Sequence, residues 1–282
     1  MSLGVKTSTV ITRIIIYTLI IIGGFILMIP FFWMLSTSLK DEGAVWLFPP
    51  RWIPNPIVWE NYKTVFTMWP FGLYLLNSVK LVIINIIGVL FSCSLVAFSF
   101  SRLRWPGRDF FFMLLISTMM IPGQVTMIPI FVLFRMLGWI DTFYPLTVPS
   151  FFGSPFYIFL LRQFFLTIPR EIEDAAKIDG CSTFQIFSRV ILPLTKPALG
   201  TVAIFTFMGV WNDFMGPLIY INSESNRTAT LALGFFRSAW YGGTHTAVLM
   251  ASSMIVMLPC LLLFFFAQRY YIQGIVITGL KG

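Results

Sequence analysis

The sequence predicts an all-α integral membrane protein with six transmembrane helices and one structured polar loop. Of its 282 residues 57% are hydrophobic and 11% are charged, whereas a soluble domain has about 25% charged residues. The mean hydropathy is +0.86. The apolar residues form six long runs, and a transmembrane helix needs roughly 20 residues. Composition and run length therefore agree on a multi-pass membrane protein.

The six runs are residues 14–35, 81–101, 110–134, 143–161, 198–221 and 247–267. A secretory signal peptide is the alternative for the first run, but its apolar region would have only about 7–15 residues. We therefore expect a retained first span. The connection that follows, residues 36–72, is rich in Pro and Trp, and Trp concentrates at membrane interfaces. This connection is expected to lie along a membrane surface.

Two of the runs contain features that a simple span does not have. The third is interrupted at Pro122, Gly123 and Gln124. A kinked helix must have its freed carbonyl groups satisfied inside a bundle or beside water. The fifth contains Asp213, the one carboxylate within an apolar run. A charge inside the membrane is by default a functional candidate, although Asp213 could also lie at a hydrated helix end.

The lysines and arginines predict the orientation. Six spans place both termini on one side. With the N-terminus in the cytoplasm, twelve of the nineteen basic residues are cytoplasmic and seven are not. Cytoplasmic loops carry an excess of Lys and Arg, so both termini are expected in the cytoplasm. The two-helix loop, residues 167–193, falls on the same side.

Several classes of activity are disfavoured. The net charge of +8 is explained by the cytoplasmic loops, and no basic run with interleaved aromatics predicts nucleic-acid binding. Three distant cysteines provide no metal-ligand spacing and no disulfide framework. A His-based metal site or a catalytic triad would have to use the single His245, whose Gly and Thr neighbours indicate an exposed loop, so we treat it as incidental. No Gly-x-x-x-x-Gly-Lys-Ser/Thr segment occurs, so the commonest phosphate-binding loop for ATP is absent. We expect no catalytic residue, metal or cofactor on this chain.

The two-helix loop has clear local signals. Pro169 suits the first turn of a helix, and acidic side chains follow where the helix dipole favours negative charge. Gly180 can adopt the left-handed conformation that ends a helix. Ser182 and Gln185 have the spacing of a capping box for a second helix. A solvated connection between two spans is the simpler interpretation of these features, and the local chemistry alone leaves both open.

The same residues resemble the EAA loop of ATP-driven importer permeases. That pattern has Glu-Ala-Ala, three residues, Gly, nine residues, an aliphatic residue, any residue and Leu-Pro. Asp174 replaces the Glu, which keeps the charge but shortens the reach. The resemblance implies that the loop contacts an ATPase through these residues: Glu171, Asp174, Ala175, Ala176, Asp179, Gly180, Phe184, Leu192 and Pro193. The small Ala175 and Ala176 would let another surface approach closely.

Two further segments are similar to carbohydrate-importer permeases of the maltose-system type. One is Trp211, Asn212, Asp213 and Phe214, of which we take the first three as candidates for the substrate pathway. The other is the C-terminal Thr-Gly-Leu-Lys-Gly, which in that family reaches the ATPase dimer, here through Thr278, Gly279 and Lys281. The resemblance covers about residues 73–282 and is weak before residue 70. We therefore divide the chain into residues 1–72, a permease domain at 73–270 and a cytoplasmic tail at 271–282.

The resemblance implies a type I ABC-importer permease fold in a bacterial plasma membrane. It implies a heterodimer with a second permease, two copies of a cytoplasmic ATPase that bind ATP and Mg, and an extracytoplasmic binding protein. The expected substrate is a carbohydrate of the oligosaccharide class that the binding protein delivers, and its path would form between the two permeases. Two other hypotheses remain open from the residues: a proton-coupled secondary transporter that uses Asp213 as a relay, and a membrane scaffold without transport.

Overall fold

The computed structural model describes residues 3–239 and 245–279, with side chains for residues 12–236 and 245–267. All regular elements in this described part are helical. The chain divides into two compact units, which are described separately. The first comprises Met1–Trp69 and Phe236–Met257, and the second comprises Pro70–Phe235 and Leu258–Gly282.

The first unit contains the long helix α1 (Leu3–Ser38), followed by α2 (Glu42–Val45) and α3 (Glu60–Met68). Polar side chains close the end of α1. The amide of Asn61 donates to the carbonyls of Ser38 at 2.9 Å and Lys40 at 2.8 Å. The Lys40 side chain is buried, with its Nζ 4.0 Å from the centre of the Trp33 ring, and burial lowers the pKa of the amine. These contacts hold the turn that follows α1 in one conformation.

The start of α15 (Thr246–Gly279) also lies in the first unit. The Glu42 carboxylate accepts hydrogen bonds from the backbone N–H groups of Thr246 at 2.6 Å and Ala247 at 3.0 Å. The first N–H groups of a helix have no intrahelical partner, and a carboxylate is also favoured by the helix dipole there. Glu42 therefore stabilises the beginning of the last long helix.

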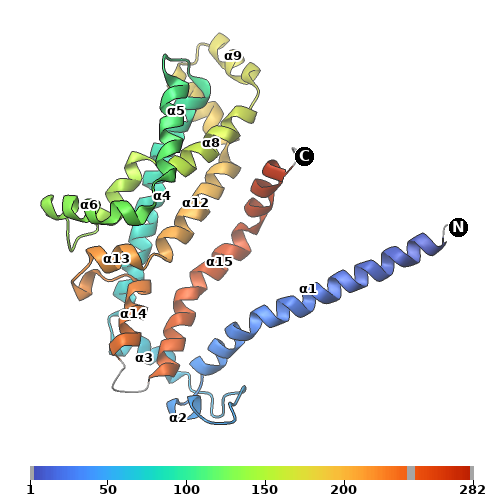
Figure 1. The fold of residues 1–282 in the computed structure, drawn as a ribbon, viewed down its shortest axis with the longest axis vertical. Coiled ribbons are helices and arrows are strands. Elements are labelled where there is room, and N and C mark those ends of the chain that lie inside the picture. The colour runs from blue at the N-terminus through green and yellow to red at the C-terminus, as the bar shows by residue number, and fades with distance from the viewer. Residues whose placement is uncertain (1–2, 240–244, 280–282) are drawn as a thin grey trace. The chain divides into compact units, whose positions relative to one another are not determined.

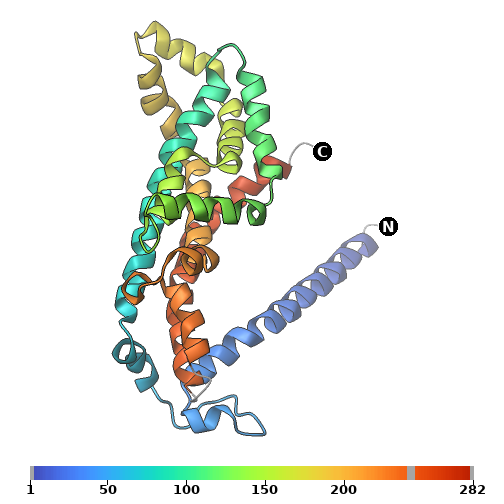
Figure 2. The ribbon, with the colours of Figure 1, turned by 60° about the vertical axis from the view of Figure 1, so that its left-hand side comes forward.

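The second unit is built on α4 (Phe71–Arg102), a continuous helix about 48 Å long at 1.5 Å per residue. It packs against α8 (Pro155–Thr167) and α12 (Lys196–Trp211). In Figures 1 and 2, α9 (Arg170–Ile178) lies at the end of this unit where α4 ends and α5 begins. The α4 helix therefore connects the two-helix loop to the opposite end of the unit.

An irregular segment packs on the middle of α4. It comprises α7 (Tyr144–Thr147) and the 3₁₀ helix η2 (Val148–Phe152). A Cβ at Gly88 would overlap the Ser150 hydroxyl and lie 2.8 Å from the Phe151 ring, so only glycine allows this approach. The amide of Asn85 donates to the Leu146 carbonyl at 2.9 Å, and the Ser92 hydroxyl donates to the Ser150 carbonyl at 3.0 Å. Broken backbone at membrane depth is satisfied here by side chains of α4.

The third expected span is broken more sharply than a kink. Its two parts are α5 (Arg108–Ser117) with η1 (Thr118–Met120), and α6 (Gly123–Met136), and they meet at 97°. Pro122 disfavours helical backbone at the preceding residue, and Ile121 is extended with φ −81° and ψ 115°. The break that the sequence predicts at Pro122 is confirmed. Because the angle is 97°, α6 runs nearly perpendicular to α5.

The fifth expected span ends earlier than predicted. Helix α12 stops at Trp211, Asn212 and Asp213 are not helical, and α13 (Met215–Tyr220) follows. The expectation that Asp213 lies within a helix of residues 198–221 is therefore wrong. The carboxylate instead accepts a hydrogen bond from the Gly216 N–H at 3.0 Å, so its side chain supports the first turn of the next helix. The remaining elements are η4 (Glu224–Asn226) and α14 (Ala229–Ala239).

Six spans are compatible with the helices by length and composition. Three single helices could cross a membrane within the described residues, namely Thr12–Ser38, Phe71–Arg102 and Thr246–Ala267. Counting each of three bent helix pairs as one span gives up to six. The first of these helices buries none of its most apolar window within the chain, whereas Phe71–Arg102 buries 56%. The chain's own packing is therefore concentrated on α4.

Candidate functional site

The first helix of the two-helix loop, α9, begins at Arg170, one residue later than its sequence predicts. Pro169 precedes it with φ −56° and ψ 137°, and Glu171 and Glu173 occupy its first turn. Gly180 has φ +80°. Its N–H donates to the Lys177 carbonyl at 3.0 Å, and that arrangement closes the helix. The left-handed glycine expected from the sequence is confirmed, and the chain turns sharply after it.

The second helix is continuous but not uniform. The capping box is formed: Gln185 N–H donates to Ser182 Oγ at 3.3 Å, and Ser182 N–H donates to Gln185 Oε1 at 2.7 Å. Next come α10 (Thr183–Gln185), the π-helix η3 (Ile186–Ile191) and α11 (Leu192–Leu194). Pro193 cannot donate a backbone hydrogen bond to the preceding turn because it has no N–H group. Short π-helical segments such as η3 are frequent at functional sites. The loop then meets α12 at 77°.

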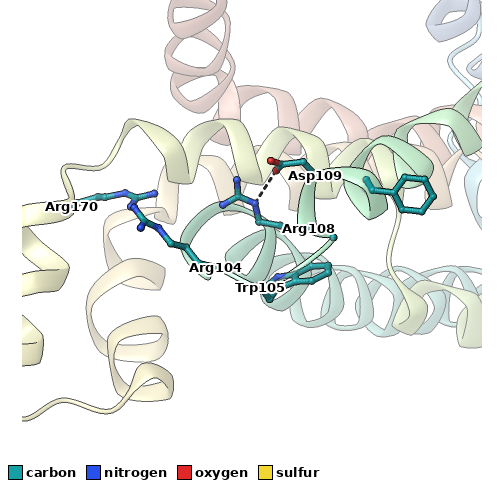
Figure 3. A pocket seen from close by; sticks show the side chains of 7 residues that line it. Arg104, Trp105, Arg108, Asp109 and Arg170 are labelled. Atoms are coloured by element: carbon teal, nitrogen blue, oxygen red, sulfur yellow. Dashed lines mark hydrogen bonds and ion pairs between the residues drawn. The ribbon is translucent and has the colours of Figure 1, made fainter.

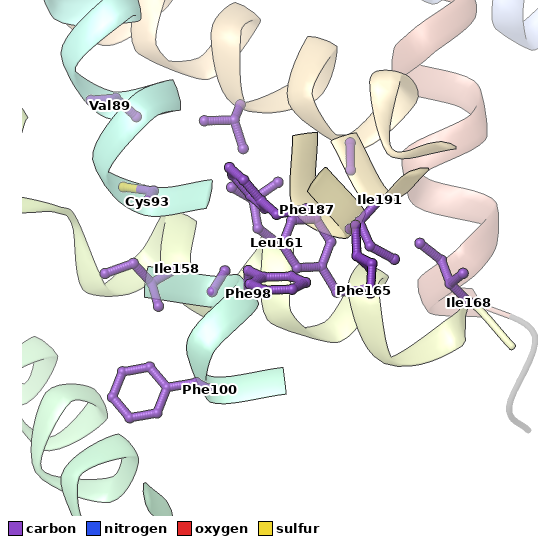
Figure 4. Close-up of a cluster of buried hydrophobic side chains, with 14 of the residues drawn as sticks. Val89, Cys93, Phe98, Phe100, Ile158, Leu161, Phe165, Ile168, Phe187 and Ile191 are labelled. Atoms are coloured by element: carbon purple, nitrogen blue, oxygen red, sulfur yellow. The ribbon is translucent and has the colours of Figure 1, made fainter. Parts of the chain in front are cut away.

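The inner face of the loop is part of a large apolar cluster (Figure 4). This cluster joins α4, α8 and α12 to the loop, and its fully or nearly buried members include Phe98, Leu161, Phe165, Phe187 and Ile191. Phe98 and Phe187 lie with ring centroids 5.1 Å apart. Ala176 is buried in the same cluster. The small size of Ala176 therefore serves packing within the chain, and only Ala175 of the pair is exposed.

A buried ion pair also fixes α9 to the end of α4. Arg102 Nη1 lies 2.9 Å from Glu173 Oε1, and the two side chains are 2% and 9% exposed. The N–H is not aligned with that oxygen, so charge rather than an aligned hydrogen bond holds the pair. Arg102 Nη2 donates to the Ile168 carbonyl at 2.7 Å and also to the Phe165 carbonyl. One guanidinium thus joins α4, the end of α8 and α9.

This pair was not predicted from the sequence. Arg102 is one of three arginines that follow an apolar run, together with Arg104 and Arg108, and the sequence indicated only a cytoplasmic position for all three. Glu173 was one of several acidic residues in a first turn. The sequence did indicate that Glu173 and Ala176 lie on the same face of α9, because they are three residues apart. That face is the buried one.

The outer face of the loop carries most of the predicted contact residues. Exposed positions are Glu171, Asp174, Ala175, Asp179, Gly180, Phe184 and Pro193, while Leu192 is partly buried. Large apolar side chains accompany them: Phe184 is 69% exposed and Ile178 is 87% exposed. Asp174 forms a surface ion pair with Lys177 at 2.9 Å. The loop therefore presents a mixed acidic and apolar surface on a firmly packed base.

The candidate pathway residues have different surroundings. The Trp211 ring is buried and stacks on Phe207, with centroids 5.6 Å apart. Asn212 is exposed and donates to the Met208 carbonyl at 2.9 Å, and Asp213 is half-buried. Trp211 thus packs inside its unit, and the two polar residues remain candidates. Of the predicted tail contacts, Lys281 lies outside the described residues, as does the side chain of Thr278, and Gly279 is the last residue of α15.

A second polar cluster holds the opposite end of the unit. Asp141, with φ +64°, accepts hydrogen bonds from the backbone N–H groups of Asn222 at 2.9 Å and Ser223 at 2.8 Å. The hydroxyl and N–H groups of Ser223 hold the pKa of the Asp141 carboxyl below its usual value. On α4, Asn77 donates to the Arg227 carbonyl at 3.0 Å. These bonds fix the segment between α13 and α14.

Comparison with known proteins places these features in a family. Residues 88–277 match the model of the binding-protein-dependent transport system inner membrane component. The chain is 37% identical to a putative ABC transporter permease protein, ORF2, of Caldicellulosiruptor sp., over 90% of this chain and 92% of that protein. It is 34% identical to the arabinooligosaccharides transport system permease protein AraQ of Halalkalibacterium halodurans, over 88% of this chain and 86% of that protein.

A solved structure has the same fold. A chain of a bacterial ABC transporter involved in the import of the acidic polysaccharide alginate superposes with a TM-score of 0.82 at 24% identity, covering 94% of this chain and 98% of that chain. The predicted all-α importer-permease fold is therefore confirmed. With its two-helix loop in the matched region, the chain belongs to the binding-protein-dependent transport system inner membrane component family.

Proposed function

We propose that this permease forms half of a transmembrane pathway for a carbohydrate of the oligosaccharide class. Relatives named for arabinooligosaccharides and diacetylchitobiose support the substrate class. The observation that carries the proposal is the two-helix loop, because a polar element with an exposed outer face is fixed to a long membrane helix.

The loop is proposed to receive movement from a partner ATPase. Its exposed residues, including Asp174, Ala175 and Phe184, provide the contact surface, and the Arg102–Glu173 pair and the apolar cluster connect that surface to α4. A ligand shifts a conformational equilibrium only through different interactions with the two states. ATP binding would act by bringing the ATPase dimer into the form that fits one position of the loop better.

The proposed complex contains a second, related permease, two copies of a cytoplasmic ATPase and an extracytoplasmic binding protein. ATP and Mg bind to the ATPase, since the sequence of this chain has no Gly-x-x-x-x-Gly-Lys-Ser/Thr segment. The exposed apolar side chains of α1 would contact lipid or the second permease. Both termini lie in the bacterial cytoplasm in this proposal, and Thr278, Gly279 and Lys281 of the tail contact the ATPase.

Asn212 and Asp213 are proposed to face the substrate path. They lie in the break between α12 and α13, where backbone and side-chain polar groups are not used up by helical hydrogen bonds. Carbohydrates present hydroxyl groups in many directions, and polar side chains in an irregular segment can exchange hydrogen bonds with them. The half-buried position of Asp213 fits a water-filled path better than a lipid-facing surface.

The test is uptake by the purified complex in proteoliposomes, with ATP enclosed and a series of labelled oligosaccharides and monosaccharides outside. We expect uptake of at least one oligosaccharide that requires ATP and the binding protein. Uptake that survives without ATP but stops when the proton gradient is removed would contradict the proposal in favour of a proton-coupled carrier. Normal cellular uptake after deletion of this chain would contradict a pathway role altogether.

A further inference from the structure

An arginine-lined pocket lies beside the two-helix loop and is not used by the proposed coupling contacts. It has a volume of about 440 Å³ and is lined by residues from the connection after α4, the start of α5 and the start of α9. Arg104, Arg108 and Arg170 supply three guanidinium groups, and Trp105 and Phe110 supply aromatic rings. Figure 3 shows the side chains of Arg104 and Arg170 directed toward one another.

Two of the three arginine charges in this pocket have no carboxylate partner among the described residues. Arg108 Nε pairs with Asp109 Oδ1 at 2.9 Å. Within the described part of the chain, neither Arg104 nor Arg170 has a carboxylate at ion-pair distance. Like charges held close together repel, so an anion between these two groups would lower the electrostatic energy. The planar guanidinium fork matches the oxygens of a phosphate group.

The surroundings of the pocket indicate where the phosphate comes from. Helix α5 begins at the pocket, and its first turns carry exposed apolar side chains: Phe110 is 67%, Met113 is 71% and Leu114 is 53% exposed. A bound molecule with a phosphate at the arginines would therefore have an apolar surface directly beside it. Trp105, which lines the pocket, is a residue type that concentrates where membrane meets water.

We propose that this pocket binds the head group of an anionic phospholipid of the cytoplasmic leaflet. The phosphate lies between Arg104 and Arg170, with Arg108 nearby, and the acyl chains follow the exposed side chains of α5. The predicted orientation places the pocket on the cytoplasmic side, where anionic lipids create a negative surface potential. Because Arg170 begins α9, a lipid bound there also contacts the base of the two-helix loop.

The experiment uses the full chain in its purified complex after delipidation. Native mass spectrometry measures the apparent affinity for phosphatidylglycerol, for zwitterionic phosphatidylcholine and for inorganic phosphate. We expect the wild type to prefer phosphatidylglycerol. The double variant Arg104→Gln/Arg170→Gln should weaken phosphatidylglycerol binding roughly 25-fold, about fivefold for each lost charge. The control Arg135→Gln changes an exposed arginine of α6 and should leave the affinity unchanged.

Three outcomes would overturn the proposal. Equal phosphatidylglycerol affinity of the wild type and the double variant would remove the role of the arginines. Inorganic phosphate that binds as tightly as phosphatidylglycerol would assign the pocket to a free anion. Loss of the ATPase from the double variant at unchanged lipid affinity would assign it to a protein contact. If the double variant does not accumulate, the single variants Arg104→Gln and Arg170→Gln replace it, and unchanged affinity in both overturns the proposal.

Discussion

At one end of α4 the two-helix loop is fixed by a buried ion pair and an apolar cluster, whereas at the other end the segment between α13 and α14 is fixed by hydrogen bonds. Arg102 and Glu173 are almost inaccessible to water, and the apolar cluster at the same end includes Phe187 and Ile191. At the other end, Tyr74 donates to Glu224 at 2.8 Å and Asn77 to the Arg227 carbonyl at 3.0 Å.

This difference is instructive because the two kinds of contact fail differently. An uncompensated buried charge costs about 3–5 kcal/mol, whereas a typical hydrogen bond contributes about 0.5–1.5 kcal/mol. The end that contains the two-helix loop should therefore move with α4 as one piece. The other end can lose single bonds and re-form them.

The largest effect is expected for Glu173→Gln, which leaves Arg102 buried without its counter-charge. The unpaired buried charge destabilises the closed loop by about 3–5 kcal/mol, so the loop should open more often. Chymotryptic cleavage after the exposed Phe184 should therefore accelerate on the order of a hundredfold or more. Inside-out membrane vesicles make this cleavage measurable.

The matched control is Asp174→Asn on the same helix. Asp174 and Lys177 form an ion pair whose side chains are 64% and 61% exposed, and such surface pairs contribute under about 1 kcal/mol. Cleavage should change less than about fivefold. Similar acceleration in both variants would show that the buried pair has no special role. The double variant Arg102→Met/Glu173→Leu, which removes both charges, should recover much of the resistance.

A smaller effect is expected for Gly180→Val, which places a β-branched residue at φ +80°. No atom within 4 Å of a Cβ would oppose the side chain, so the cost of about 1–2 kcal/mol comes from backbone strain. The variant should insert normally but lose ATP-driven uptake, because the turn between α9 and α10 changes. Gly180→Ala should show an intermediate loss.

Gly180→Asn is the control for this strain, since asparagine tolerates the left-handed conformation better than other non-glycine residues. It should retain most of the uptake. Full uptake in the valine variant at normal insertion would show that the angle of the turn does not matter for coupling.

At the opposite end, a still smaller effect is expected for Asp141→Asn. The pKa of Asp141 is lowered by the hydroxyl and N–H of Ser223, so the ionised form stabilises the folded state. That contribution is complete above the unperturbed pKa of about 3.9 and is lost as the pH falls through the lower folded-state value. Proteolysis of residues 221–228 should therefore increase below about pH 4 in the wild type. The Asp141→Asn variant should lack the part of this pH dependence that Asp141 contributes, and so should show a smaller increase in the same assay.

The smallest effect on stability is expected for Asp213→Asn, because the asparagine oxygen can still accept the Gly216 N–H. Asp213→Ala should cost about 1 kcal/mol by losing that bond. If the carboxylate faces the substrate path, Asp213→Asn lowers uptake at unchanged insertion and thermal stability. Unchanged uptake would reduce Asp213 to the support of α13.

Much of the fold could be predicted because it depends on local pattern. Run length and hydropathy predicted the spans, Pro122 predicted the break in the third, and Ser182 with Gln185 predicted the start of the second loop helix. The left-handed conformation of Gly180 followed from its position after a helix. Each of these features is encoded within a few residues.

The features that were missed depend on contacts between distant residues. Arg102 and Glu173 are brought together only when α4, α8 and the two-helix loop pack. Asp213 was placed in a continuous helix because it lies within the apolar run of residues 198–221. The Gly216 N–H group, whose hydrogen bond its carboxylate accepts, becomes available only once the chain leaves α12. A short sequence pattern does not reveal contacts that form only when distant segments of the chain pack together.

The buried Arg102–Glu173 pair is the contact through which we expect movement of the two-helix loop to reach α4. Its role is tested by the number of substrate molecules imported per ATP hydrolysed by the reconstituted complex with Glu173→Gln. Loss of about 1–3 kcal/mol of coupling predicts a ratio lower by roughly 5- to 150-fold, while ATP hydrolysis continues and the ATPase still co-purifies. A wild-type ratio in a fully assembled Glu173→Gln complex would refute this role of the pair.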